Sequence, residues 1–349
     1  MADLSARRRR LLERLQRSED PSIRWRVLVR VLGMDRSTGP VRRIEKEILT
    51  SAHVLALLTR QGAPFVRGRH GGIYRSWQGS HWVLTSLADL GYPRGDESLR
   101  PFLDRAVAMW TRPEYDRVCR VRNDVERKGA RGVVLLNGRF RRCASQQGNA
   151  LLYLSRLGFP DERARHLVRL LQRWQWGDGG WNCSQAPDAH VSSFMETLAP
   201  MRGLAAYAAA TGSEQARRLA CRAAEVFLRR QLYLRRSTQT VMRPDFLRLH
   251  YPLYWHYDVL GGLKGLAEVG LLEDPRCQKA LDWLESRELP QGGWPVDARY
   301  YHPSSRYESG GEYVDWGTPS LRRPNDWVTT DALYVLTEAG RLGIRGSRP

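Results

Sequence analysis

The chain has 349 residues, of which 42% are hydrophobic and 27% are charged. This is the composition of an ordinary globular domain and argues against a disordered chain. No stretch approaches the roughly 18 consecutive apolar residues of a membrane-spanning helix, and the mean hydropathy is −0.51. The N-terminus lacks the apolar core of a secretory signal, and the five cysteines form no Cys-x-x-Cys pair. We therefore expect a reduced, cytoplasmic protein.

The net charge of +19 comes from 56 basic and 37 acidic residues. Such an excess is typical of proteins that bind nucleic acid or an anionic membrane surface. Only four of the basic residues are lysines, however, and a genome-wide preference for arginine codons also accounts for that bias. We favour this second explanation, which places the charge on solvated helix faces such as residues 7–10.

Helical patterns follow one another along most of the chain. Two helical segments are expected at residues 21–32 and 41–59. Four helical hairpins come next, and they begin at His81, Cys143, His190 and His256. In each hairpin an apolar helix ends near a glycine, and an amphipathic helix follows. The second helices start at residues that can cap an N-terminus, namely Asp96, Asp161, Ser213 and Asp274. A last apolar helix is expected at residues 325–340.

Strand signals are weak along the whole sequence. Only residues 132–136 and 239–242 have the composition of short ribbons. The long segments between the hairpins, among them residues 289–324, are rich in Gly, Pro, Arg and aromatic residues. Loops of this length in a compact domain usually have a function. We predict an all-α protein of paired helices.

Two of the amphipathic helices lead into a Gly-Gly-Trp sequence. Residues 279–294 read KALDWLESRELPQGGW, and residues 164–181 read ARHLVRLLQRWQWGDGGW. Both resemble the repeat of squalene–hopene cyclases and related terpenoid cyclases, in which a glutamine precedes Gly-x-Trp. The glutamine position is filled by Gln175 in one copy and by Glu288 in the other. In such a repeat the Gln or Glu caps a helix end and the Trp covers the next turn. We therefore expect both Trp residues to be buried.

This resemblance implies membership of the superfamily of terpenoid cyclases and protein prenyltransferases. Its fold is the α/α toroid, a double ring of inner and outer helices with about six hairpins. We accordingly predict an N-terminal helical extension at residues 1–50 and one toroid domain at residues 51–349, with long connecting loops.

In a toroid, one face of each inner helix lines a central cavity. Helical periodicity places Glu196 and Asp258 on such faces. A carboxyl group in an apolar cavity tends to stay protonated and can initiate polyene cyclisation, so we predict these two residues as catalytic acids. The structural alternative is that Asp258 caps its helix and Glu196 pairs with an arginine. The predicted substrate-binding residues are His81, Tyr153, His190, Tyr254, Trp255, His256, Tyr257, Trp327 and Tyr334.

The motifs that carry chemistry in this superfamily are not found in the sequence. There is no Asp-x-Asp-Asp acid motif, no Asp-x-Cys, and no histidine in the last apolar helix. Cys183 and His190 lie seven residues apart without a second pair of ligands. We therefore predict no metal and no cofactor, and leave open whether the chain is an enzyme.

The function predicted from these features is that of a divergent terpenoid cyclase-like or prenyltransferase-like protein. It would bind an isoprenoid or another apolar small molecule, with or without a diphosphate, and cyclise or transfer it. One alternative is a non-catalytic toroid that serves as a binding protein or scaffold. Another is a basic helical-repeat protein that contacts an anionic membrane peripherally or, less in keeping with the sequence, binds nucleic acid.

Overall fold

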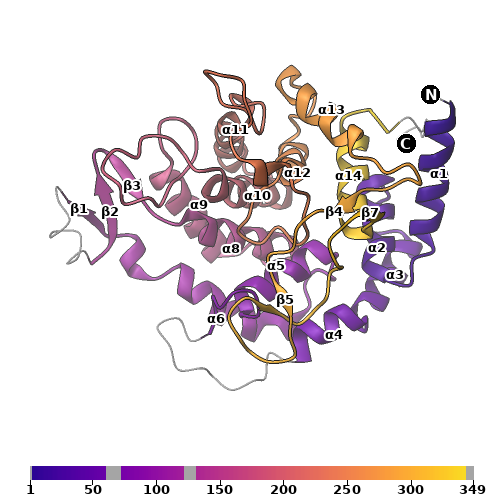
Figure 1. Cartoon of the computed structure of the whole chain (residues 1–349). Coiled ribbons are helices and arrows are strands. Elements are labelled where there is room, and N and C mark those ends of the chain that lie inside the picture. The colour runs from indigo at the N-terminus through magenta and orange to yellow at the C-terminus, as the bar shows by residue number, and fades with distance from the viewer. Residues whose placement is uncertain (1, 60–71, 122–130, 343–349) are drawn as a thin grey trace. The chain divides into compact units, whose positions relative to one another are not determined.

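The computed structural model describes residues 2–59, 72–121 and 131–342 (Figure 1). Most of these residues lie in helices, which confirms the predicted fold class at that level. Within the described ranges, no helix combines the length and the apolar character needed to cross a membrane. The chain divides into two compact units. Unit 1 consists of Met1–Pro93, Gln231–Tyr254 and Asp258–Pro349, and unit 2 consists of Arg94–Arg230 and Trp255–Tyr257.

Unit 1 begins with four helices: α1 (Ala2–Gln16), α2 (Pro21–Trp25), α3 (Gly39–Leu49) and α4 (Ala52–Thr59). The Asp20 side chain caps α2 by accepting from the Ser22 N–H at 2.7 Å. The helix predicted at residues 21–32 changes after α2 into a π-helical segment, Arg26–Val31. The helix predicted at residues 41–59 is interrupted between α3 and α4, which corrects the expectation of one continuous helix.

Further α-helices in the described part of unit 1 are α5 (Ser80–Leu90), α12 (Val259–Val269), α13 (Gln278–Ser286) and α14 (Asp326–Glu338). They confirm the helices predicted in these regions, and α12 packs against α14. Two small sheets belong to the same unit. β4 (Pro295–Val296) pairs with β7 (Ser320–Pro324) in antiparallel orientation, and β5 (His302–Pro303) pairs with β6 (Gly311–Glu312) in parallel orientation.

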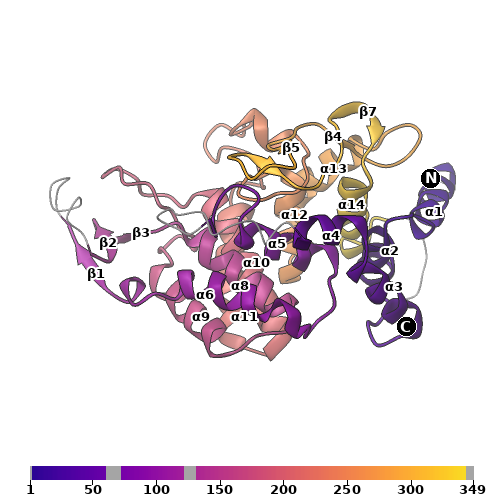
Figure 2. The same ribbon diagram turned by 90° about the horizontal axis from the view of Figure 1, so that it is seen from below.

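Unit 2 contains α6 (Arg100–Trp110), α8 (Ala144–Arg156), α9 (Glu162–Trp174), α10 (Phe194–Thr211) and α11 (Glu214–Leu228). Helices α8 and α10 lie side by side (Figure 2). Their backbones approach closely because of two glycines. A Cβ atom at Gly148 would lie 2.3 Å from the Pro200 nitrogen, and one at Gly203 would lie 2.3 Å from the Gly148 oxygen. Any larger side chain at these positions would push the two helices apart.

A three-stranded sheet completes unit 2. β2 (Val133–Leu136) pairs in parallel with β1 (Val118–Arg120) and in antiparallel orientation with β3 (Arg139–Arg141). Asn137 and Gly138 both have positive φ angles, as a tight hairpin turn requires. The ribbon predicted at residues 132–136 is therefore confirmed. The second predicted ribbon, at residues 239–242, takes part only in an isolated bridge between Leu234 and Val241.

Local capping chemistry follows the sequence closely. The predicted N-caps each accept a hydrogen bond from a backbone N–H of the following turn: Asp96, Asp161, Ser213 and Asp274. Glycines in the left-handed conformation end three of the apolar helices: Gly91, Gly212 and Gly270. Three of the four predicted pairs are thus confirmed, namely α8 with α9, α10 with α11, and α12 with α13, whereas α5 and α6 belong to different units. Closure of the helical pairs into a toroid remains a prediction, as does a separate extension at residues 1–50, which lie within unit 1.

Each Gly-Gly-Trp turn fastens its tryptophan to the helix before it. Trp181 is 1% exposed and Trp294 is fully buried, as predicted. The indole N–H of Trp181 donates to the Leu171 carbonyl of α9 at 3.0 Å. The indole N–H of Trp294 donates to the Leu284 carbonyl of α13 at 2.7 Å. Both tryptophans therefore pack against their own hairpin with the polar edge satisfied.

The residue at the glutamine position joins each turn to another helix of the same unit. The Gln175 amide donates to the Gly179 carbonyl at 2.6 Å and to the Leu219 carbonyl of α11 at 3.1 Å. Glu288 instead accepts from the Arg8 guanidinium of α1 at 2.9 Å. The neutral amide of Gln175 thus donates to backbone carbonyls, whereas the carboxylate of Glu288 accepts from an arginine.

Candidate functional site

Glu196, a predicted catalytic acid, lies in the first turn of α10 and is 1% exposed. Its two carboxylate oxygens receive donors from three different segments of unit 2. The Ser145 backbone N–H donates to Oε2 at 3.0 Å, and the Trp255 indole N–H donates to Oε1 at 3.1 Å. The Cys183 thiol also reaches Oε1, at 3.5 Å. The carboxylate is therefore placed as a hydrogen-bond acceptor.

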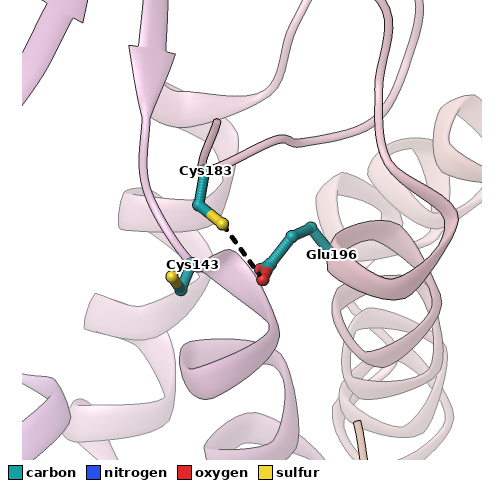
Figure 3. A group of neighbouring side chains, drawn as sticks. All are labelled: Cys143, Cys183 and Glu196. Atoms are coloured by element: carbon teal, nitrogen blue, oxygen red, sulfur yellow. Dashed lines mark hydrogen bonds between the residues drawn. The ribbon is translucent and has the colours of Figure 1, made fainter. Parts of the chain in front are cut away.

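Cys143 and Cys183 lie beside this carboxylate (Figure 3). The two sulfur atoms and one Glu196 oxygen are all within 4.8 Å of one another. The pKa of Cys143 is lowered because the Cys183 thiol interacts with it, although burial opposes the shift. The pKa of Cys183 is raised by the same interaction and by burial. We did not predict this cluster, because its three members are far apart in the sequence.

Asp258, the second predicted acid, is fully buried in unit 1. One of its oxygens caps α12 by accepting from the Gly261 N–H at 2.6 Å. The other accepts from the backbone N–H of His250 at 3.0 Å and pairs with the Nδ1 atom of its ring, also at 3.0 Å. Burial lowers the pKa of His250, but the charge and hydrogen bond of Asp258 outweigh it and raise that pKa. These are the contacts of the structural alternative, and the acid role of Asp258 stays a prediction.

A different carboxyl group, Glu312 in β6, has the surroundings of an acid. It is 1% exposed, and its Oε1 atom accepts from the N–H groups of Tyr313 at 2.7 Å and Val314 at 3.3 Å. Its Oε2 atom is buried and forms no hydrogen bond with any described residue. Burial raises the pKa of Glu312 to about 8, although the two N–H groups and the nearby Trp316 indole act in the opposite direction. The group is therefore mostly protonated at neutral pH.

Four ring side chains of unit 1 form what we call the aromatic cluster: His53, Tyr251, Trp316 and Trp327. Tyr251 and Trp327 stack with their planes 10° apart and their centroids 5.2 Å apart. Trp316 meets the Trp327 ring edge-on at 5.1 Å. Because Trp316 also lies near the Glu312 carboxyl group, the acid borders this cluster.

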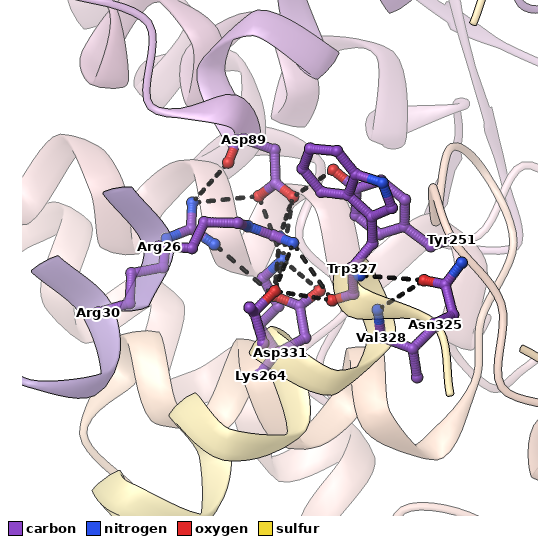
Figure 4. Close-up of polar contacts among 10 residues, drawn as sticks. Arg26, Arg30, Asp89, Tyr251, Lys264, Asn325, Trp327, Val328 and Asp331 are labelled. Carbon is purple, nitrogen blue, oxygen red and sulfur yellow. Dashed lines mark hydrogen bonds and ion pairs between the residues drawn. The ribbon is translucent and has the colours of Figure 1, made fainter. Parts of the chain in front are cut away.

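A cluster of buried ion pairs lies beside Tyr251 and Trp327 of the aromatic cluster (Figure 4). The Arg26 guanidinium contacts both Asp89 and Asp331 at 2.8 Å. The Lys264 ammonium contacts the same two carboxylates at 3.1 and 2.9 Å, and Arg30 contacts Asp89 at 3.3 Å. Burial lowers the pKa of Lys264 to about 8 against the effect of the two carboxylates.

One member of this ion cluster, the Arg26 guanidinium, also lies over two of the aromatic rings. The Arg26 guanidinium lies 5.1 Å from the centroid of Tyr251 and 5.4 Å from that of Trp327. These distances are within the range of cation–π attraction. The ion cluster thus joins the π-helical segment, α5, α12 and α14, and fixes one face of the aromatic cluster.

Four of the predicted substrate-binding residues belong to unit 1. Trp327 is part of the aromatic cluster, whereas Tyr254 stacks on Trp77 with centroids 4.4 Å apart. His81 is fully buried against Trp82, and burial lowers its pKa to about 3, so its ring is neutral at physiological pH. Tyr334, on α14, is half-buried. Their binding roles remain predictions.

The other five predicted substrate-binding residues belong to unit 2. Trp255 donates to Glu196, as described above, and is followed by half-buried His256. Tyr257 stacks on Phe227 at 5.7 Å. Tyr153 is fully buried, and burial raises its pKa. His190 is exposed and its Nδ1 atom lies 2.8 Å from the Asp188 carbonyl oxygen, outside the cysteine cluster.

Glu312 and its neighbour Trp316 were missed by the sequence reasoning. The available signal was their place in the long segment at residues 289–324, which we expected to be functional. Whether a carboxyl group in such a loop is buried depends on how the loop folds back, and no periodic pattern encodes that. His53 and Tyr251 join the cluster from two other segments that are distant in sequence.

No protein family matches the chain, and no curated protein matches it. Two solved structures are similar to it, both variants of the type II terpene cyclase MstE from Scytonema in complex with geranylgeranyl dihydroxybenzoate, its substrate. The first is 14% identical, covers 87% of this chain and 100% of the cyclase chain, and has a TM-score of 0.27. The second is 15% identical, covers 85% and 98%, and has a TM-score of 0.26. TM-scores this low do not establish a shared fold.

Proposed function

We propose that the chain is a divergent terpenoid cyclase-like protein that binds an isoprenoid or similar apolar molecule beside the aromatic cluster of unit 1. We further propose that Glu312 acts as its catalytic acid. The observation that carries this proposal is the buried Glu312 carboxyl group, with one oxygen held by backbone N–H groups and the other unpartnered among the described residues. The two Gly-Gly-Trp turns support the same class of protein through their resemblance to terpenoid cyclase repeats.

The chemistry would begin with the transfer of the Glu312 proton to a carbon–carbon double bond of a linear isoprenoid. The electron pair of the double bond forms the new C–H bond, and the adjacent carbon becomes a cation. Further double bonds of the chain can then attack this cation and close rings. Loss of a proton from the last cation restores neutrality, and Glu312 takes up a proton again from solvent.

The surroundings of Glu312 support both halves of this step. Because burial keeps the carboxyl group protonated at neutral pH, the proton is available when the ligand binds. The Tyr313 and Val314 N–H groups would stabilise the carboxylate that remains after transfer. The faces of Trp316, Trp327 and Tyr251 would stabilise a carbocation by cation–π attraction. Tyr251 and Trp327 already have such a contact with Arg26.

The acid role first predicted for Glu196 and Asp258 has weaker support. Both carboxylates accept hydrogen bonds on both oxygens, so neither oxygen is left to donate a proton to a ligand without losing one of these contacts. An acid that donates its proton to an alkene needs the opposite surroundings. We therefore assign proton donation to Glu312 within this proposal.

The test compares Glu312→Gln with wild-type protein and with Glu308→Gln, an exposed glutamate of the same loop. Each protein is incubated with squalene, farnesyl diphosphate or geranylgeranyl diphosphate, and organic extracts are analysed by gas chromatography and mass spectrometry. We expect cyclised product from wild type and Glu308→Gln, and a rate lower by about 10²- to 10⁴-fold in Glu312→Gln.

Other outcomes separate the alternatives. Saturable binding of these isoprenoids without product would favour the non-catalytic binding protein or scaffold. Equal product from Glu312→Gln and wild type would contradict the acid role. If the isoprenoids neither bind nor react, and the protein instead binds anionic vesicles or nucleic acid in a salt-dependent way, the proposal is wrong. The basic helical-repeat protein predicted from the net charge would then be the better description.

A further inference from the structure

We propose that Cys143, Cys183 and Glu196 form a zinc-binding site in unit 2. Their two sulfur atoms and one carboxylate oxygen lie within 4.8 Å of one another (Figure 3). In a tetrahedral zinc site, with Zn–S about 2.3 Å and Zn–O about 2.0 Å, neighbouring donors are about 3.4–3.8 Å apart. A contraction of about an ångström would therefore bring all three donors into coordination.

The backbone around each donor is well defined by contacts within unit 2. Cys143 is the N-cap residue of α8 and follows directly after β3 and Arg142. Cys183 follows Asn182, which forms a parallel bridge with Arg141 of β3. This bridge brings the two cysteines together although they are far apart in the sequence. Glu196 is fixed in the first turn of α10, which Ser193 caps.

A second layer of donors orients the glutamate. The Ser145 N–H and the Trp255 indole N–H hold its two oxygens at 3.0 and 3.1 Å. Hydrogen bonds of this kind fix the direction of a ligand and raise the affinity of metal sites. They also give hydrogen-bond partners to both oxygens of a carboxyl group that is 1% exposed.

The donor set indicates the metal. Two thiolates with one carboxylate suit zinc, whereas magnesium and calcium select oxygen ligands only. Three protein donors leave the fourth position of a tetrahedral ion to water or to a substrate, as in catalytic zinc sites. Both cysteines are half-buried, so an ion can reach them. The site involves unit 2 only and does not depend on the acid proposed in unit 1.

Metal analysis of the full chain tests this inference. The protein is purified under reducing conditions without chelators, exchanged into buffer with Zn²⁺ or Co²⁺, and freed of unbound ion. We expect about one zinc per chain by inductively coupled plasma mass spectrometry, and a thiolate-to-cobalt charge-transfer band in the Co²⁺ form. The band should fall to about half or less in Cys143→Ser and in Cys183→Ser, because its intensity follows the number of thiolates.

Two further variants sharpen the result. Glu196→Gln should keep the charge-transfer band but bind Zn²⁺ about 10- to 100-fold more weakly in competition with a chelator. Cys221→Ser changes a cysteine of α11 in the same unit, outside the cluster, and should retain full zinc content. Circular dichroism of each variant shows whether it has folded. If a cysteine variant has not folded, the zinc affinities of wild type and Glu196→Gln, measured by chelator competition, decide whether Glu196 is a zinc ligand.

Three results would overturn the proposal. One is wild-type protein that retains no zinc and gives no cobalt band. Another is zinc content in Cys143→Ser or Cys183→Ser equal to that of wild type. The third is a Cys143–Cys183 disulfide in protein kept under reducing conditions, detected by peptide mass spectrometry, because oxidised sulfur atoms cannot bind the ion as thiolates.

Discussion

Units 1 and 2 contain the same arrangement of a Gly-Gly-Trp turn and a capped helix, and each unit also holds a buried glutamate. In both, a helix leads into a Gly-Gly-Trp turn, and a capped helix follows later in the chain. The backbone N–H of Trp181 donates to the Thr197 hydroxyl at 3.2 Å, and that of Trp294 donates to the Thr329 hydroxyl at 3.0 Å. Each threonine lies in the first turns of the capped helix, so turn and helix are joined in the same way in both units.

The glutamates differ in how their hydrogen bonds are distributed. Glu196 and Glu312 are each 1% exposed. Both oxygens of Glu196 receive donors, and these come from separate segments. The backbone donors of Glu312 both reach one oxygen and are the N–H groups of the next two residues, while the Trp316 indole lies nearby. Equal burial therefore leads to different chemistry, because the placement of donors decides whether a carboxyl group serves as an acceptor or stays available as an acid.

The largest expected effect tests the arrangement that the two units share. Trp181→Ala and Trp294→Ala should each lower the free energy of unfolding by about 3–5 kcal/mol, because each removes a buried indole and leaves a cavity. Urea denaturation followed by circular dichroism measures both losses. A loss below about 1 kcal/mol in either variant would contradict the fastening role of that tryptophan.

A smaller effect should distinguish Glu312 from exposed glutamates through pH. The pKa of Glu312 is raised in the folded state to about 8. Unfolded chains lose this proton near pH 4.5, so its contribution to stability is complete below that pH and is lost as pH rises towards 8. Relative to Glu312→Gln, the wild type should lose on the order of 3 kcal/mol of unfolding free energy between pH 5 and pH 8.

Denaturation curves across this pH range provide the measurement, with Glu308→Gln as the control. The pKa of Glu308 is lowered by hydrogen bonds from Ser304 and His302, so its replacement should change the slope above pH 5 far less than Glu312→Gln does. Parallel stability curves for wild type and Glu312→Gln would show that Glu312 ionises normally and would remove the basis for its acid role.

The smallest expected effect concerns the glutamine position of the two turns, filled by Gln175 in one and by Glu288 in the other. Glu288→Gln breaks a buried contact with Arg8 but leaves the arginine its bonds to the carbonyls of Arg341 and Leu342. Gln175→Glu places a carboxylate against the carbonyls of Gly179 and Leu219. Each change should cost about 1–3 kcal/mol of stability. Thermal unfolding without denaturant, at low and at high salt, measures the loss of stability. A gain in stability from either change would contradict the contacts described for Glu288 and Gln175.

Much of the local structure could be predicted from sequence because its causes are local. Asp96 and Asp161 cap their helices as expected, since a capping side chain needs only the next turn of backbone. The burial of Trp181 and Trp294 followed from the Gly-Gly-Trp pattern. The breaks in the N-terminal helices were missed, because the apolar pattern at residues 41–59 continues across the interruption at Thr50.

The candidate sites were harder to predict, because they depend on contacts between distant segments. Glu196 was predicted to face a central cavity, which stays a prediction; its donors come from Ser145 and Trp255, which periodicity cannot place. Cys143 and Cys183 meet only through the bridge beside β3. Glu312 lies in a loop without periodicity, and its burial results from tertiary packing alone.

The central claim is that Glu312 is a neutral acid at physiological pH. Carbon-13 NMR of protein labelled at the glutamate side-chain carboxyl carbon tests it most directly, with the Glu312→Gln variant used to assign the signal. We expect one carboxyl resonance that titrates with a midpoint near pH 8 and is missing from the variant. A Glu312 resonance that titrates below about pH 5, in the range of ordinary glutamates, would contradict the claim.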